Sequence, residues 1–198
     1  MENIKLFCVS LGCDKNLVDT EKMLGLLNGQ GIIFTDDETE ADVILINTCC
    51  FIGDAKEESV NTILEMARYK EEGNLKALLV AGCLAQRYKQ EILDEIPEVD
   101  AILGTTSYEE VATVLEQVLM GSSGVHLSCF RDLSQLPQVE ARRVVTTGGH
   151  YAFLKIAEGC DKRCTYCIIP YLRGPYRSVP IEQLVAEAGQ LAEAGVKE

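Results

Sequence analysis

Strand-like and helix-like segments alternate along the first 120 residues of this 198-residue chain. Short apolar runs predict strands at residues 5–10, 32–34, 43–46, 77–81 and 101–103. Apolar residues at helical spacing predict helices at residues 17–27, 54–70, 84–93 and 108–120. Such alternation is typical of an open parallel sheet that helices cover on both faces. We therefore expect residues 1–120 to form a doubly wound α/β domain.

The regular alternation stops at Gly121. Residues 121–150 contain a Gly-Ser-Ser-Gly run, Pro137 and scattered charge with weak periodicity, which together predict a linker. A further strand is predicted at residues 151–157 and an amphipathic helix at residues 180–194. A strand, a loop and a helix are the first unit of a β/α barrel, so we expect residues 151–198 to begin a second domain.

Three cysteines stand close together between these last two elements, in the C-x3-C-x2-C spacing of Cys160, Cys164 and Cys167. Three soft thiolate ligands on one tight loop suggest an iron–sulfur cluster with one iron left open. An open iron can coordinate a substrate and deliver an electron into a bond that breaks homolytically. A structural zinc site is the alternative, but zinc usually takes four ligands, and neither His126 nor His150 has the required spacing from this loop.

Three other cysteines, Cys13, Cys49 and Cys83, each follow a predicted strand. The carboxyl ends of parallel strands face one crevice, so residues far apart in the sequence can converge there. Gly12 and Gly82 would let the backbone approach a bulky ligand closely. The pattern predicts a second cluster held by three cysteines. Ordinary packing of buried thiols remains an open alternative.

The chain has nine cysteines but no export signal, which favours reduced thiols, a cytoplasmic location and no structural disulfide. Cys50 adjoins Cys49 and could compete with it as a ligand, whereas Cys8 and Cys129 are expected to be packing or bystander thiols. No apolar run approaches the ~20 residues of a membrane span, so we expect no membrane association.

The formal net charge of -13 argues against a general nucleic-acid surface, because such surfaces neutralise phosphates with Lys and Arg. Residues 142–178 are the exception, since seven basic residues stand there against two acidic ones. We call this stretch the basic strip. It allows two interpretations, solvated loop charges or a site that binds an anion or a partner.

The two cysteine sets together resemble those of the radical S-adenosylmethionine methylthiotransferases, and the resemblance runs from about Lys5 to the last residue. The family's amino-terminal motifs match residues 11–13, 47–49 and 82–83, and its central motif matches residues 159–167. Residues 10–19 look like the branch called RimO, which modifies an aspartate of ribosomal protein S-twelve. In the tRNA-modifying branch, MiaB, a Gln-Met pair usually stands at positions 14 and 15.

The resemblance implies two 4Fe-4S clusters and S-adenosyl-L-methionine as cofactors. Cys160, Cys164 and Cys167 would hold the cluster that binds S-adenosylmethionine, and Tyr166 occupies the position of an aromatic residue typical of such cofactor sites. The second cluster, on the three strand-end cysteines, would supply the sulfur. The implied product is a β-methylthio-aspartate, and the implied partners are ribosomal protein S-twelve or the small ribosomal subunit and an electron donor of the flavodoxin or ferredoxin type.

Two departures from the family pattern matter. Val179 stands where the family usually has an arginine, and the chain stops before most of the barrel. We therefore expect an amino-terminal fragment of the enzyme with a truncated radical-SAM domain, which is inactive alone if the missing part is needed. The alternatives are a tRNA adenosine methylthiotransferase, which would use the basic strip as a nucleic-acid contact, and a non-catalytic iron–sulfur binding module.

Overall fold

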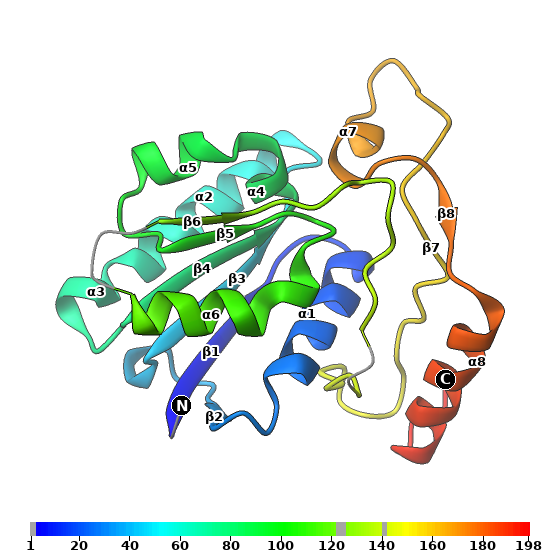
Figure 1. Ribbon diagram of the computed structural model, residues 1–198, viewed down its shortest axis with the longest axis horizontal. Helices are drawn as coiled ribbons and strands as arrows, with labels where there is room; N and C mark the ends of the chain where they lie inside the picture. The colour runs from blue at the N-terminus through cyan, green and yellow to red at the C-terminus, as the bar shows by residue number, and fades with distance from the viewer. Residues whose placement is uncertain (1–2, 122–125, 140–141) are drawn as a thin grey trace.

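The computed structural model describes residues 3–121, 126–139 and 142–198. Its centre is a six-stranded sheet in which every neighbouring pair is parallel, with strand order β2-β1-β3-β4-β5-β6 (Figure 1). The strands are β1 (Ile4–Ser10), β2 (Ile32–Phe34), β3 (Val43–Thr48), β4 (Ala77–Gly82), β5 (Ala101–Leu103) and β6 (Leu127–Cys129). The predicted parallel sheet is confirmed, and five of its strands lie within two residues of the predicted bounds.

Helices cover both faces of this sheet, as predicted. One face carries α1 (Asp14–Leu27) and α6 (Val111–Met120), which lie in front of the sheet in Figure 1. The other face carries α2 (Gly53–Ala67), α4 (Cys83–Tyr88) and α5 (Gln90–Glu95). Shorter elements complete this part, namely η1 (Glu38–Glu40), α3 (Tyr69–Glu72) and η2 (Tyr108–Glu110).

The central strands alternate their side chains between two apolar cores. In β3, Ile44 and Ile46 join the core under α2 and α4, whereas Val43 and Leu45 join the core under α1 and α6. All six residues of β3 are buried, which is the pattern of a strand covered on both faces. Each fully buried side chain of this size contributes about 1.5–3 kcal/mol, so the central strands are the most firmly held part of the molecule.

Two predicted helices are each divided in the structure. The helix predicted at residues 84–93 is interrupted at Lys89, whose φ of 44° is incompatible with a continuous helix, so α4 and α5 are separate. The helix predicted at residues 54–70 ends as α2 at Ala67, and α3 follows it. The sheet also extends into the predicted linker, because β6 lies at residues 127–129 and pairs with β5.

The segment after residue 142 has little regular structure before its final helix. It contains β7 (Ala157–Glu158), α7 (Ile169–Arg173), β8 (Arg177–Ser178) and α8 (Ile181–Glu193). The strand predicted at 151–157 is therefore wrong except at its last residue, because only β7 has a paired neighbour, the antiparallel β8. The predicted helix at 180–194 is confirmed as α8.

The strand order places a topological switch point between β1 and β3. The chain passes from β1 to β2 on one side and then returns to place β3 on the other side of β1. In doubly wound sheets of this order, ligands bind beyond the carboxyl ends of the strands at that point. None of the described helices is long and apolar enough to span a membrane.

Candidate metal centre

Three cysteines follow directly from adjacent strands at the carboxyl edge of the sheet. Cys13 lies between β1 and α1, Cys49 follows β3, and Cys83 begins α4 immediately after β4. Cys13 is exposed, whereas Cys49 and Cys83 are each only 7% exposed. We call Cys13, Cys49 and Cys83 the strand-end cysteines. Cys13 and Cys49 flank the switch point, where ligands bind in sheets of this kind, and Cys83 follows the next strand.

Two glycines bring the backbone at this edge into unusually close contact. Gly12 has a φ of 92°, and a Cβ atom there would lie 2.6 Å from Cβ and 2.8 Å from Sγ of Cys49. Gly82 also has a φ of 92°, and its Cβ atom would lie 2.2 Å from Oδ1 of Asn47. Only glycine fits both the conformation and the space. The backbone beside Cys13 therefore lies directly against the side chain of Cys49.

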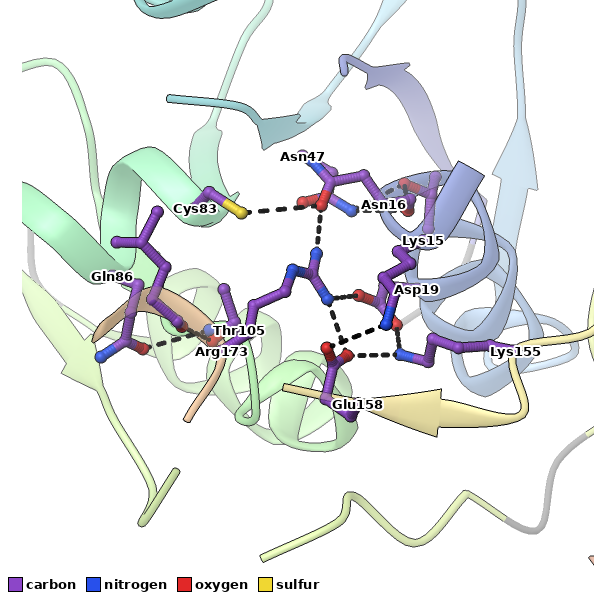
Figure 2. Close-up of polar contacts among 12 residues, drawn as sticks. Lys15, Asn16, Asp19, Asn47, Cys83, Gln86, Thr105, Lys155, Glu158 and Arg173 are labelled. Atoms are coloured by element: carbon purple, nitrogen blue, oxygen red, sulfur yellow. Dashed lines mark hydrogen bonds and ion pairs between the residues drawn. The ribbon is translucent and has the colours of Figure 1, made fainter. Parts of the chain in front are cut away.

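The side chain of Asn16, on α1, forms hydrogen bonds at the ends of β1 and β3. Its side chain is fully buried, and its Nδ2 donates to the backbone oxygens of Leu11 and Thr48, both at 2.9 Å. Its Oδ1 accepts from Arg173 and lies 3.9 Å from the Cys83 thiol, which donates to it (Figure 2). Every polar atom of the Asn16 side chain thus has a partner, which fixes the strand ends relative to Cys83.

Burial determines the protonation of the inner thiol. Burial raises the pKa of Cys83 to about 12, and the nearby Arg173 charge acts in the opposite direction. Burial also raises the pKa of Cys50, whose thiol donates to the backbone oxygen of Cys83 at 3.2 Å. Since metals bind the thiolate, a metal at Cys83 would have to displace a proton.

All nine cysteines are free thiols. In the described part of the chain, no group of three or more His, Cys, Asp or Glu side chains is already arranged around a position for one metal ion. The donors at the sheet edge are nevertheless the soft ligands that iron–sulfur clusters use, and two glycines let the backbone beside them pack closely. The ligand role of the strand-end cysteines stays a prediction that rests on this placement.

The second predicted site is an open loop. Cys164 is exposed and Cys160 and Cys167 are half-buried, while Tyr166 is 87% exposed. The loop is held by two backbone hydrogen bonds, from Cys167 N to Cys164 O at 3.0 Å and from Cys160 N to Gly174 O at 3.1 Å. Its roles in binding a cluster and S-adenosylmethionine stay predictions.

A buried network of charges lies between the two cysteine sets, and the sequence analysis did not predict it. Arg173 Nη1 lies 3.1 Å from Asp19 Oδ2 and 2.7 Å from Glu158 Oε2. Lys155 Nζ lies 3.1 Å from Glu158 Oε2 and also pairs with Asp19 (Figure 2). We call Asp19, Lys155, Glu158 and Arg173 the buried ion cluster. Lys155, within the otherwise apolar residues 151–157, was the one signal that could have revealed it.

The charges of this cluster support one another. Burial opposes the ionisation of Glu158, but Lys155 and Arg173 lower its pKa to about 2. Burial likewise opposes the charge of Lys155, yet the carboxylate of Asp19 holds its pKa above the ordinary value. The charges of Glu158 and Lys155 are therefore each favoured by oppositely charged neighbours, which is the arrangement that makes a buried ionic site tolerable.

A second ionic contact fastens the residues before the cysteine loop. Arg143 Nε lies 3.1 Å from Glu21 Oε2 on α1, and its Nη1 lies 2.9 Å from Glu187 Oε1 on α8. Both Arg143 and Glu21 are almost completely buried. Arg142 pairs with Glu193 on the surface. Four of the seven cations of the basic strip are therefore paired with carboxylates, and three of these four are buried.

Comparison with known proteins identifies the family of this chain. Residues 5–104 match the model of the uncharacterized protein family UPF0004. The chain belongs to this family. Among curated relatives, it is 64% identical to the ribosomal protein uS12 methylthiotransferase RimO of Lachnoclostridium phytofermentans over 98% of the chain and 44% of that protein. It is 52% identical to the RimO proteins of Acetivibrio thermocellus and Trichlorobacter lovleyi, over 98% of the chain and 44% and 43% of those proteins.

These matches confirm the resemblance to RimO that residues 10–19 predicted. The chain spans less than half the length of the curated relatives that it matches. The matched family region, residues 5–104, contains the strand-end cysteines and ends before β6.

Proposed function

We propose that these 198 residues are the amino-terminal part of a radical S-adenosylmethionine methylthiotransferase that acts on an aspartate of ribosomal protein S-twelve. The observation that carries the proposal is the placement of the strand-end cysteines after three adjacent parallel strands, at the switch point of the sheet. The names of relatives 52–64% identical to the chain support the same activity.

In this proposal the two cysteine sets have different tasks. Cys160, Cys164 and Cys167 would hold the 4Fe-4S cluster that binds S-adenosylmethionine, and the strand-end cysteines would hold the second 4Fe-4S cluster. The bound cofactors would supply the radical that removes a hydrogen from the β-carbon of the aspartate and the methylthio group that replaces it. The exposed ring of Tyr166 beside Cys167 is available to bind the cofactor.

The protein's own part is to position and shield these groups. Gly12 and Gly82 permit close packing at the sheet edge, and Asn16 fixes the strand ends around it. Domain boundaries near residues 120 and 150 belong to the same proposal, with the radical-SAM domain beginning at about residue 151. We further propose a cytoplasmic enzyme that receives electrons from a flavodoxin or ferredoxin type of donor.

The ion pairs of the basic strip weigh against the tRNA alternative. Binding to a phosphate backbone requires free Lys and Arg side chains. Arg143, Lys155 and Arg173 are buried and paired with carboxylates, so they are not available to phosphates. This favours a protein substrate over tRNA.

The proposal is tested in the full-length protein with single substitutions of the strand-end cysteines. Cys49→Ala should abolish methylthio transfer to ribosomal protein S-twelve but leave reductive cleavage of S-adenosylmethionine to 5′-deoxyadenosine, because the second cluster alone is lost. Cys50→Ala is the matched control, since Cys50 is a buried neighbour that is not one of the three proposed ligands, and it should retain both reactions.

Four outcomes would contradict the proposal. Retention of methylthio transfer in Cys49→Ala would exclude the second cluster, and loss of iron in Cys50→Ala would show that the wrong neighbour was chosen. Transfer to tRNA in place of ribosomal protein S-twelve would support the MiaB-like alternative. Absence of any S-adenosylmethionine cleavage by the full-length protein would leave a non-catalytic iron–sulfur module.

A further inference from the structure

Two consecutive residues, Arg173 at the end of α7 and Gly174 after it, link the two predicted cysteine sites. Arg173 and the thiol of Cys83 meet at one atom, Oδ1 of Asn16. The next residue, Gly174, accepts a hydrogen bond from the backbone N–H of Cys160 at 3.1 Å. Arg173 thus shares a hydrogen-bond acceptor with Cys83, while Gly174 is hydrogen-bonded to the first cysteine of the loop.

The position of these two residues is fixed by the packing around them. Leu172 belongs to the same apolar core as Cys83 and is 3% exposed, and its backbone oxygen accepts from Thr105 Oγ1 at 2.5 Å. A Cβ atom at Gly174, where φ is 75°, would lie 2.3 Å from the backbone oxygen of Leu133. The guanidinium of Arg173 therefore has little freedom to leave the site.

The charge of Arg173 is held in place by carboxylates on the side away from Cys83. Asp19 and Glu158 contact Nη1, whereas Nη2 points to the Asn16 oxygen that also accepts from the thiol (Figure 2). A buried cation acts strongly on a neighbouring group, because little water screens it. The potential of an iron–sulfur cluster responds to nearby charge and to hydrogen bonds near its sulfurs.

We propose that Arg173 is a positioning residue that raises the reduction potential of the cluster bound through Cys83. The inference rests on the proposed function, because it requires Cys83 to be a cluster ligand. Reduction adds one negative charge to a cluster, so a fixed cation nearby stabilises the reduced form. Asp19 acts with the opposite sign, since its carboxylate partly offsets the same cation.

The test uses the 198-residue chain with Cys160, Cys164 and Cys167 all replaced by Ala, so that one cluster remains. After anaerobic reconstitution with iron and sulfide, the midpoint potential is measured by redox titration followed by electron paramagnetic resonance. In this background, Arg173→Met should lower the equilibrium constant for reduction by about tenfold, or about 59 mV for one electron. Arg173→Lys should recover part of that shift, and Asp19→Asn should raise the potential.

The sign of the shifts separates electrostatic positioning from a merely structural role, because a structural defect would not move the potential in opposite directions in Arg173→Met and Asp19→Asn. Equal potentials in the background chain, Arg173→Lys and Asp19→Asn would overturn the inference, even if Arg173→Met fails to fold. A background chain that binds no iron would contradict the proposed function itself. Iron bound with unshifted potentials would leave the proposed function intact and remove only the role of Arg173.

Discussion

The close approach of Gly12 to Cys49 gives the most direct test of the site, because Cys49 is one of the predicted ligands. Gly12→Ala changes no cysteine, but it adds one carbon atom where the structure has no room. The new Cβ would lie 2.8 Å from Sγ of Cys49, so the sulfur must move by about 0.6 Å to reach an ordinary contact of 3.4 Å. A functional site tolerates displacements of only about 0.5 Å.

The expected loss of stability has two parts. An alanine at a φ of 92° costs about 1–2 kcal/mol, because its Cβ atom crowds the following carbonyl. Overpacking against Cys49 adds about 1–3 kcal/mol. We therefore expect Gly12→Ala to lower the free energy of unfolding by about 2–5 kcal/mol.

Gly29 offers a matched control for the cost of placing an alanine at a positive φ. Its φ is 80°, and a Cβ atom built there would meet nothing within 4 Å. Gly29→Ala should therefore lose only about 1–2 kcal/mol. Urea unfolding of both apo variants measures these losses, and iron and sulfide content after anaerobic reconstitution measures assembly of the strand-end site.

We expect Gly12→Ala to lose the iron held by the strand-end cysteines and Gly29→Ala to keep it. Full iron content in Gly12→Ala, measured with Cys160, Cys164 and Cys167 replaced by Ala, would contradict this expectation. It would mean that the position of the Cys49 sulfur does not limit assembly. Equal loss of iron in both variants would show that general destabilisation, rather than the contact, decides the result.

Two further predictions concern the buried charges. The pKa of Glu158 is lowered from 4.5 to about 2, so its stabilising contribution, at most about 3 kcal/mol, is complete above pH 4.5 and disappears as the pH falls towards 2. Urea unfolding between pH 7 and 2 should show this loss, and an unchanged slope in Glu158→Gln would contradict it. Arg143→Met should lower the free energy of unfolding at pH 7 by about 3 kcal/mol, because it leaves the carboxylate of Glu21 buried without its cation. Adding Glu21→Gln should restore most of the loss, and an equally unstable double variant would argue against the pairing.

The sheet could be predicted from the sequence because its strands carry strong local signals. All residues of β3 and β4 are buried, and all but Asn47 and Thr48 are apolar or glycine, while the segments before and after these strands have apolar residues at helical spacing. The edge strand β6 has only three residues, none of them fully buried, so it lacks such a signal. Residues 151–156 are apolar enough to predict a strand, yet they form none. An apolar pattern forms a strand only where another strand is available to pair with it.

The sequence predicted the two cysteine sets, one from its spacing and the other from positions after predicted strands. It did not predict the polar and charged groups around them. Asn16 and Arg173 meet across 157 residues of sequence, and Asp19 meets Lys155 across 136. No periodicity relates residues at such separations. Their partnership depends on how the segment after residue 142 packs on α1, which only the folded structure reveals.

The ionic contacts of the segment after residue 142 determine how the cysteine loop is placed. Arg143 with Glu21, and Arg173 with Asp19, join by charge two parts of the chain that Leu172 also joins through the apolar core. Pairing in a buried site gains little more than desolvation costs, and ions that separate recover their hydration. The ion pairs therefore set the orientation of this segment more than they add to its stability. We expect the cysteine loop to keep one preferred distance from the sheet edge.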